Sequence, residues 1–204
     1  MQSGNSKTPW ATTTKAATAV YDTASLLGIN ATSTLHLKNR LKLVDWEQLV
    51  QISTIAYSRL VGANPVQGLA FAPVIEPNHP GAVITRTPDD VLNSGDFNLT
   101  PMLMGYNSME GVDFPLQVAF STYFTITQLA SEGLVPKSFN ITDPVLLKEV
   151  GDVLKAYYFG DLSAVTFTDY QAIPYIGDLY FVIDAIQTAQ IASRFTKVFF
   201  YVFS

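Results

Sequence analysis

The stretch that decides the fold is Pro101-Met102-Leu103-Met104-Gly105-Tyr106-Asn107-Ser108-Met109-Glu110-Gly111, an apolar run followed by a turn. The run Met102–Met104 predicts a strand, and Gly105 and Gly111 border the segment that carries one acid, Glu110. In a parallel α/β sheet, a strand that ends in such a turn presents a functional side chain at the carboxyl edge of the sheet. Glu110 is therefore a candidate catalytic carboxylate, and a solvated carboxylate in a turn is the alternative that this pattern leaves open.

Helices alternating with short apolar strands on either side of this stretch predict an α/β chain. The segment Val198–Phe203 is short, aromatic and β-branched, which predicts a strand buried on both faces, as in a central parallel sheet. Repeated Gly and Pro between residues 62 and 100 leave room only for short extended pieces, Leu69–Phe71 and Ala82–Ile84. Four helices are predicted: one from Ala16 to Gly28, one with Asp45 as its N-cap, one that begins at Asp143-Pro144 and ends at Gly160, and one over Asp178–Ser193.

The predicted helices are expected to bury the apolar residues that recur at helical spacing. These residues are Ala16, Ala17, Val20, Ala24 and Leu27 in the first helix, Trp46, Leu49, Val50, Tyr57 and Leu60 in the second, Leu146, Val150, Val153, Leu154 and Tyr157 in the third, and Leu179, Val182, Ile186 and Ala189 in the last.

The composition narrows the class of protein. The chain is 48% hydrophobic and 14% charged, against about 25% charged residues in a typical soluble domain, so most of it is expected to be interior. No apolar window reaches the roughly 18–20 residues that a spanning helix needs, and no transmembrane segment is predicted. The net charge of −5 and the lack of a basic run argue against a nucleic-acid partner. Without cysteine there is no disulfide, thiolate metal site or cysteine nucleophile.

Other polar residues give weaker indications of chemistry. His36 and His79 are isolated and lack the spacing of a zinc site, which favours surface or structural roles for both. Asp113 competes with Glu110 as the acid, but its place beside Phe114 favours the start of a helix. Three N-x-S/T sequons, at Asn30, Asn98 and Asn140, fall in predicted loops and are candidate N-glycosylation sites of a secreted protein.

Five segments, taken in order, resemble type-B carboxylesterases, a family that includes insect esterases and cholinesterases. The first consists of Met1-Gln2-Ser3-Gly4-Asn5-Ser6 and the nearby Pro9-Trp10-Ala11, and it resembles the family's segment that follows the helix after the nucleophile elbow. The others are Phe71-Ala72-Pro73-Val74-Ile75-Glu76, the acid-bearing Pro101–Gly111, Asp178-Leu179-Tyr180-Phe181, and Val198–Ser204 before the family's histidine. The matches span nearly the whole chain.

The resemblance implies a partial α/β-hydrolase fold, the C-terminal portion of a doubly wound, mostly parallel sheet with inserted helices. Residues 1–204 correspond to an incomplete type-B domain, the segment between the nucleophile elbow and the catalytic histidine. In the Ser…Glu…His triad of the family, only the acid carries over, onto Glu110. The serine and the oxyanion glycines are expected upstream of Met1 and the histidine downstream of Ser204, because no G-x-S-x-G occurs here.

The function implied is hydrolysis of a small-molecule carboxylic ester through an acyl-serine intermediate, without a cofactor. The intact parent is expected to be a secreted, insect-like hydrolase, and the isolated chain to be inactive. Phe114 and Phe120 are candidate lining residues of its substrate pocket. The chain departs from the family in lacking a cysteine, and hence a disulfide, in the helical region near Leu35–Leu43.

Two alternatives remain at this point. The family also contains adhesion and binding proteins that keep the fold and lose the triad, and a fragment of such a protein would have the same residues. The second alternative is a truncated gene product without a function of its own.

Overall fold

The structure is a computed structural model that describes residues 1–61, 68–112, 130–136, 139–160 and 171–204. Its centre is a pair of parallel strands, β1 (Met102–Asn107) and β2 (Val198–Phe203). Met102 lies opposite Val198 and Asn107 opposite Phe203, so the two strands start and end together. The expectations for Asp113, Phe114 and Phe120 lie outside the described residues.

The amino terminus adds a short third segment to this sheet. Gln2 forms a parallel bridge with Gly105 on the side of β1 away from β2. The amide of Ser3 donates to the carbonyl of Gly105 at 2.9 Å, and the amide of Gly105 donates to the carbonyl of Met1 at 3.3 Å. β1 is therefore the middle of three parallel segments, and both of its hydrogen-bonding edges are used.

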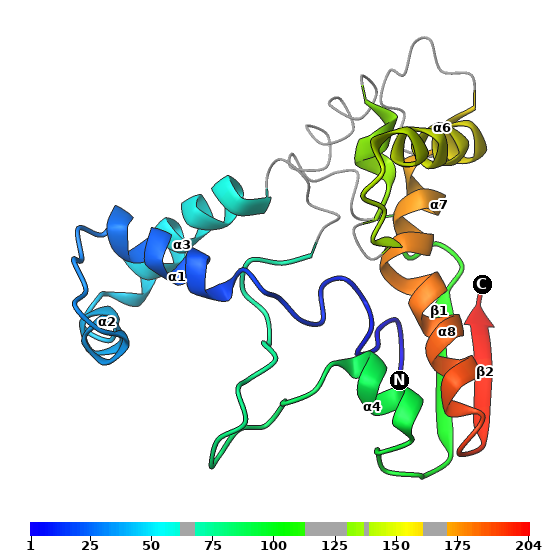
Figure 1. Ribbon diagram of the computed structural model, residues 1–204, viewed down its shortest axis with the longest axis horizontal. Helices are drawn as coiled ribbons and strands as arrows, with labels where there is room; N and C mark the ends of the chain where they lie inside the picture. Colours follow the sequence, from blue (N-terminus) through cyan, green and yellow to red (C-terminus); the bar gives the residue numbers. More distant parts are fainter. Residues whose placement is uncertain (62–67, 113–129, 137–138, 161–170) are drawn as a thin grey trace.

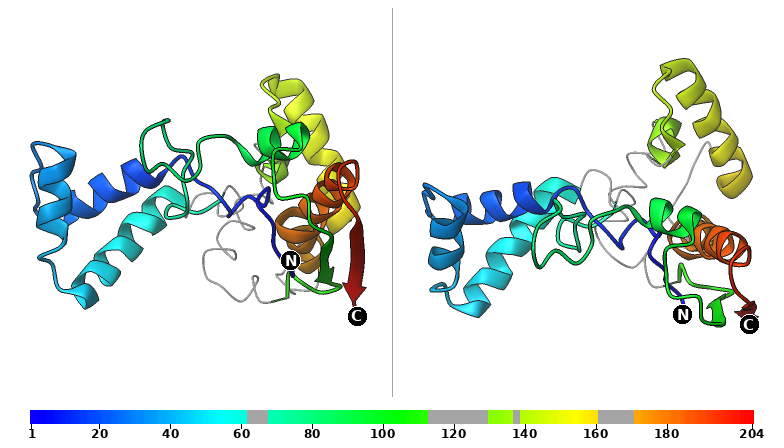
Figure 2. Two further views of the ribbon diagram at one scale, coloured as in Figure 1. Left: turned by 90° about the horizontal axis from the view of Figure 1, so that it is seen from below. Right: turned by 60° about the horizontal axis from the view of Figure 1, so that its bottom comes forward.

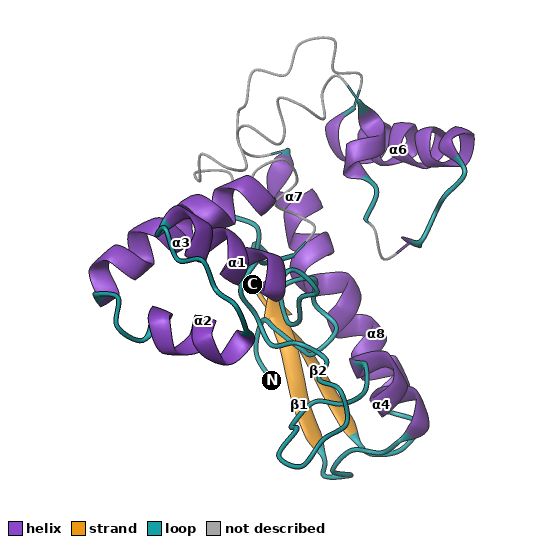
Figure 3. Ribbon diagram, turned by 60° about the vertical axis from the view of Figure 1, so that its left-hand side comes forward, coloured by secondary structure: helices purple, strands orange, loops and turns teal. Residues whose placement is uncertain are grey.

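A long helical rod lies along one face of the strands. It consists of α7 (Ala172–Gly177), a π-helical turn labelled η4 (Asp178–Val182) and α8 (Ile183–Ala192), with α8 next to β1 and β2 (Figures 1 and 3). α4 (Pro88–Ser94) packs against α8. The rod therefore forms the second layer of an α/β arrangement.

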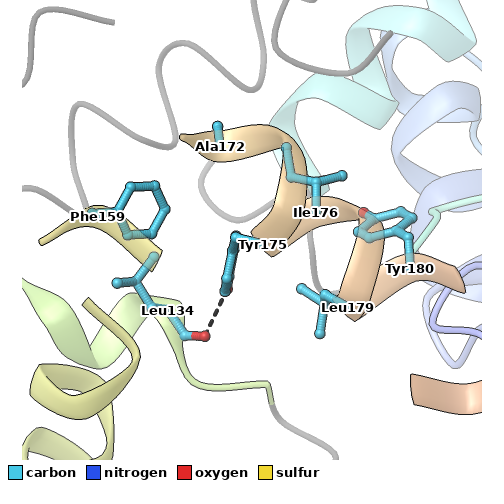
Figure 4. Close-up of a cluster of buried hydrophobic side chains, with 7 residues drawn as sticks. All are labelled: Leu134, Phe159, Ala172, Tyr175, Ile176, Leu179 and Tyr180. Atoms are coloured by element: carbon cyan, nitrogen blue, oxygen red, sulfur yellow. Dashed lines mark hydrogen bonds between the residues drawn. The ribbon is translucent and has the colours of Figure 1, made fainter. Parts of the chain in front are cut away.

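The largest buried cluster lies where the rod meets η2 (Ser131–Leu134) and α6 (Pro144–Phe159). Figure 4 shows the ring of Tyr175 next to Leu134, and its hydroxyl donates to the carbonyl of Leu134 at 2.6 Å. The cluster consists of Leu134, Phe159, Ala172, Tyr175, Ile176, Leu179 and Tyr180.

The helices α1 (Ala16–Leu26), α2 (Thr34–Leu41) and α3 (Trp46–Val61) form a separate group at the other end of the molecule (Figures 1 and 2). Its small core contains Ala19 and Ala70, with Tyr57 and Leu60 packed against them. The two groups of helices thus lie on opposite sides of the amino-terminal segment.

The predicted bounds of three helices are confirmed. The fourth, predicted over Asp178–Ser193, belongs to a rod that begins earlier, at Ala172, and α2 was not among the four predicted helices. The Asp45 carboxylate accepts hydrogen bonds from the amides of Glu47 and Gln48 at the start of α3. Asp143 caps α6 through the amide of Val145 at 2.9 Å, with Pro144 in its first turn. Gly28, with a φ of 70°, follows α1 and supplies the left-handed backbone that ends many helices.

One helix within residues 62–100 was not predicted. α4 has Thr87 as its N-cap, Pro88 in its first turn and Gly95 in the left-handed conformation at its end. These are ordinary helix start and stop signals, which the surrounding prolines and glycines obscured. The extended pieces predicted at Leu69–Phe71 and Ala82–Ile84 do not form strands.

The prediction that Val198–Phe203 is buried on both faces is wrong, although the strand itself is confirmed. Phe199 is 59% exposed and Phe203 is 69% exposed. Within the described residues β2 pairs along one edge only, with β1, so its aromatic side chains lack the neighbours that a central strand has.

Several helical faces also differ from the prediction. In α6 the buried positions are Gly151 and Phe159. The backbones of α6 and η2 approach so closely at Gly151 that a Cβ there would lie 2.5 Å from the carbonyl oxygen of Ser131. The close approach of these backbones selects that face of the helix. The expected inward residues that are exposed instead are Ala17, Trp46, Val50, Leu146, Val153, Tyr157 and Ile186.

Candidate active-site edge of the sheet

Glu110 lies in the turn that follows β1, at the carboxyl end of the strand, and is partly buried. Its Oε1 atom accepts two hydrogen bonds from Asn107, one from the backbone amide at 2.7 Å and one from Nδ2 at 3.1 Å. Within the described residues, Oε2 has no hydrogen-bond partner. One carboxylate oxygen is thus fixed by the turn, and the other is free to accept a hydrogen bond from another group.

Two further segments meet at this edge. The amide of Ser108 donates to the carbonyl of Phe203 at 2.9 Å, so the carboxyl end of β2 lies beside the turn. On the other side, Nδ2 of Asn107 is 3.3 Å from Oγ of Ser3 and donates to it. Asn107 therefore links the acid to the amino-terminal segment.

Ser3 is a residue of this edge that the sequence reasoning missed. It lies 104 residues before Asn107, and no local pattern signals such a contact. The backbone of Ser3 has a φ of 54°, which is uncommon for a residue other than glycine and is often seen at functional positions.

Gly105, within β1, and Gly111, in the turn, are both required by close packing. A Cβ at Gly105 would lie 2.1 Å from the carbonyl oxygen of Tyr201, in the paired strand. A Cβ at Gly111 would lie 2.2 Å from the carbonyl oxygen of Ile173 in α7. Gly105 thus allows β1 to pair closely with β2, and Gly111 allows the acid-bearing turn to lie directly against the rod.

The amino-terminal segment is fixed to the second layer by buried polar contacts. Oδ1 of Asn5 accepts hydrogen bonds from the amide of Lys7 at 2.9 Å and from the hydroxyl of Thr188 in α8 at 3.0 Å. Lys7 forms an ion pair with Asp89 of α4. Burial raises the pKa of the neighbouring Asp184 carboxyl to about 6; the charge of Lys7 opposes this rise and that of Asp89 adds to it.

The π-helical turn is a second point of attachment. The indole N–H of Trp10 donates to the carbonyl of Tyr180 at 3.2 Å, and the ring centroids of Trp10 and Phe181 are 6.1 Å apart. Burial raises the pKa of Tyr180. Burial also raises the pKa of Tyr158, as does its 2.7 Å hydrogen bond to Asp178. π-Helical turns are common near functional sites. The turn at Asp178–Val182 binds Trp10 and so anchors the chain segment that leads back to Ser3.

The two histidines make only local contacts among the described residues. Nδ1 of His36 lies 3.2 Å from the hydroxyl of Thr32, and Nδ1 of His79 lies 3.0 Å from the carbonyl of Pro80. Structural roles for both agree with these contacts. The described part of the chain has no group of three or more His, Cys, Asp or Glu residues that could hold a metal ion.

The three sequon asparagines lie in connections between elements. Asn30 follows α1, Asn98 lies between α4 and β1, and Asn140 lies between η2 and α6. All three are exposed, which is the accessibility that a glycan requires. In the described ranges, no helix is both long enough and apolar enough to cross a bilayer.

The whole chain, residues 1–204, matches the model of the carboxylesterase family. The chain belongs to the carboxylesterase family. It is similar to a carboxylic ester hydrolase of Bombus ignitus, at 26% identity over 200 residues that cover 96% of this chain and 34% of that protein. It is also similar to an acylcarnitine hydrolase of Rattus norvegicus, at 29% identity over 124 residues that cover 60% of this chain and 22% of that protein.

A solved structure of an esterase shows the same fold. The juvenile hormone esterase of Manduca sexta superimposes with a TM-score of 0.73 and 20% identity, over 99% of this chain and 38% of that chain. The α/β class and the family resemblance predicted from the sequence are therefore confirmed. The chain spans about a third or less of the length of the curated relatives named here.

Proposed function

We propose that this chain supplies the acid of a Ser-Glu-His triad, Glu110, to a serine hydrolase of carboxylic esters. The observation that carries the proposal is the geometry of the carboxylate. Asn107 fixes Oε1 with two hydrogen bonds, and Oε2 has no partner among the described residues. An acid that must orient an imidazole needs this combination of a fixed position and one free oxygen.

In this proposal the triad histidine follows β2. The hydrogen bond between Ser108 and Phe203 brings the end of β2 to the turn that carries Glu110. A histidine a short distance beyond this point could donate its Nδ1–H to Oε2. Glu110 would then keep the imidazole in the required tautomer and stabilise the imidazolium that forms when the serine attacks the ester carbonyl.

Residues 1–204 are, in this view, the part of the type-B domain between the nucleophile elbow and the catalytic histidine. Without the serine and the oxyanion donors, the isolated chain is expected to be inactive toward esters. The substrate class proposed is a small carboxylic ester, and acyl transfer of this kind needs no cofactor. The hydrolase names of the relatives support an enzyme over the adhesion alternative.

We also propose that the parent protein is secreted. The three exposed sequons at Asn30, Asn98 and Asn140 support this location. Expression in a secreting eukaryotic cell, followed by removal of N-glycans with an endoglycosidase, should lower the apparent mass of the product. An unchanged mass would contradict glycosylation of these sites.

The kinetic test uses a protein that contains this chain at the full length of its relatives. Glu110→Gln keeps the size of the side chain and removes the charge, so kcat for p-nitrophenyl acetate should fall by about 10⁴-fold, as for a triad acid changed to its amide. The matched control is Glu76→Gln. The Glu76 carboxylate also accepts two backbone hydrogen bonds, from Val83 and Ile84, but lies in a loop away from the sheet.

The control should leave kcat within about twofold of the unmodified protein, because surface changes of this kind are usually small in effect. Equal activity of the Glu110→Gln variant and the unmodified protein would contradict the role of Glu110. Ester hydrolysis by the purified 204-residue chain well above background would contradict the expectation that it is inactive.

A further inference from the structure

Helix α2 and the turn after it form a basic and apolar corner at the end of the molecule. Between Asp22 and Asp45 the chain has no acidic residue, although its net charge is −5. Lys38, Arg40 and Lys42 are all exposed there, and none of them forms an ion pair with a described residue. Positive charge is thus concentrated in one place on an acidic chain.

Large apolar side chains are exposed at the same corner. Leu35 is 65% exposed, Leu43 is 80% exposed, and Trp46, the first residue of α3, is 69% exposed. Single exposed apolar residues are common on protein surfaces. Residues 35–46 carry three such side chains, one of them a tryptophan, together with three cations and one acid, Asp45. This combination of apolar and cationic side chains is typical of segments that lie in the headgroup region of a bilayer.

We infer that the α2 corner, defined as Leu35, Lys38, Arg40, Lys42, Leu43 and Trp46, is a docking surface for an anionic lipid bilayer. Charge complementarity determines this choice of partner, because the three cations of the corner outnumber Asp45, the one acidic residue between Leu35 and Trp46. The leucines and the tryptophan would enter the headgroup region, and the cations would contact the lipid phosphates and carboxylates.

The shape and position of the corner support this assignment. An apolar groove of about 590 Å³ opens between α1, α2 and α3, and its only charged lining residues are Lys38 and Lys42. Figures 1 and 2 place α2 at the end of the molecule opposite β1 and β2. Bilayer binding at α2 therefore leaves the edge that carries Glu110 uncovered. The acidic remainder of the chain is repelled from the anionic bilayer, which favours the orientation with α2 toward the lipid.

The experiment is flotation of the 204-residue chain with vesicles through a density gradient. Vesicle-bound chain rises, whereas self-associated chain stays at the bottom. We expect the chain to rise with vesicles of phosphatidylcholine mixed with phosphatidylserine, and not with phosphatidylcholine alone. Added salt should weaken the binding, because the attraction between exposed charges is screened within about 10 Å at 0.1 M.

Variants assign the binding to the corner. Neutralising it with Lys38→Gln, Arg40→Gln and Lys42→Gln should weaken binding by about a hundredfold. The matched control makes the same change in charge elsewhere, with Arg59→Gln, Arg194→Gln and Lys197→Gln, all at exposed positions, and should weaken binding much less.

The apolar part of the corner is tested separately by Leu43→Ser and Trp46→Ser. These changes should lower binding at high salt, where the charge contribution is small. Far-UV circular dichroism of each variant confirms that it is folded, and the salt dependence of the unmodified chain tests the inference without any variant.

Three results would overturn the inference. The first is failure of the unmodified chain to rise with the anionic vesicles. The second is equal binding to neutral and anionic vesicles, which would indicate non-specific hydrophobic adsorption to lipid. The third is an equal loss of binding in the corner and control triple variants. If the corner variants instead changed only the oligomeric state, the partner would be a second copy of the chain and not a bilayer.

Discussion

Asn107 fixes Glu110 through two hydrogen bonds to a single carboxylate oxygen and reaches Ser3 with the same side chain. One amide therefore connects the end of β1, the acid and the amino-terminal segment. Gly111 complements it by allowing the turn to contact Ile173 without a clash. The position of the carboxylate is thus set by its nearest neighbours in the turn, which are close to it in the sequence.

Asp184 gives a prediction about pH at the same scale. Burial raises its folded-state pKa from an ordinary value of 3.8 to about 6, so the folded chain binds more protons than the unfolded chain between about pH 4 and pH 6. Stability should therefore fall as the pH rises through this window and then level off. Asp184→Asn removes this titration.

We expect the Asp184→Asn variant to be more stable than the unmodified chain at pH 7, by about 1 kcal/mol after allowance for partial exposure of the side chain. The difference should vanish near pH 4, where the unmodified Asp184 is protonated. Urea unfolding at both pH values measures it. Asp96→Asn is the comparison, since Asp96 is exposed and has Arg86 as an ion-pair partner. A constant difference across the pH range would contradict the prediction.

At the scale of elements, the sequence predicted most helices and both strands because their signals are local. Asp45 and Asp143 cap their helices through amides two or three residues away. The buried faces were less predictable. The π-helical turn at Asp178–Val182 changes the register of the rod, so α8 buries Ala185, Thr188 and Ala192 and leaves Ile186 exposed.

The attachment of Trp10 to this turn predicts a measurable contribution to stability. Trp10→Phe keeps an aromatic ring against Phe181 but removes the indole N–H that donates to the carbonyl of Tyr180. The free energy of unfolding should fall by about 1–3 kcal/mol, since the carbonyl loses its partner and the smaller ring leaves space. Trp46→Phe, at an exposed position, should cost less than about 0.5 kcal/mol. Equal losses in the two variants would contradict the anchoring role of Trp10.

At the scale of the whole molecule, the sequence predicted part of a mostly parallel sheet with helices, but it predicted a buried β2 where the strand is largely exposed. The aromatic run of β2 has the composition of a central strand, yet only one edge of it is paired in the described structure. Which side chains are buried depends on the neighbouring strands. A local pattern therefore predicts that β2 is a strand and cannot predict what covers it.

The open edge of β2 predicts self-association of the 204-residue chain. Short, uncharged, aromatic and β-branched strands with an unpaired edge add further strands readily. Phe199→Lys places a charge on this strand and should shift the chain toward monomer in sedimentation velocity. Phe71→Lys makes the same substitution at an exposed loop position and should have little effect. A monomeric unmodified chain at all concentrations would contradict this prediction.

The most direct measurement of the central claim is proton NMR of a protein that contains this chain at the length of its relatives. If Glu110 binds the triad histidine, an imidazole N–H in a hydrogen bond to a carboxylate should give a far-downfield proton resonance. That resonance should be present in the unmodified protein and in Glu76→Gln, and absent in Glu110→Gln. Its persistence in the Glu110→Gln variant would contradict the assignment of Glu110 as the triad acid.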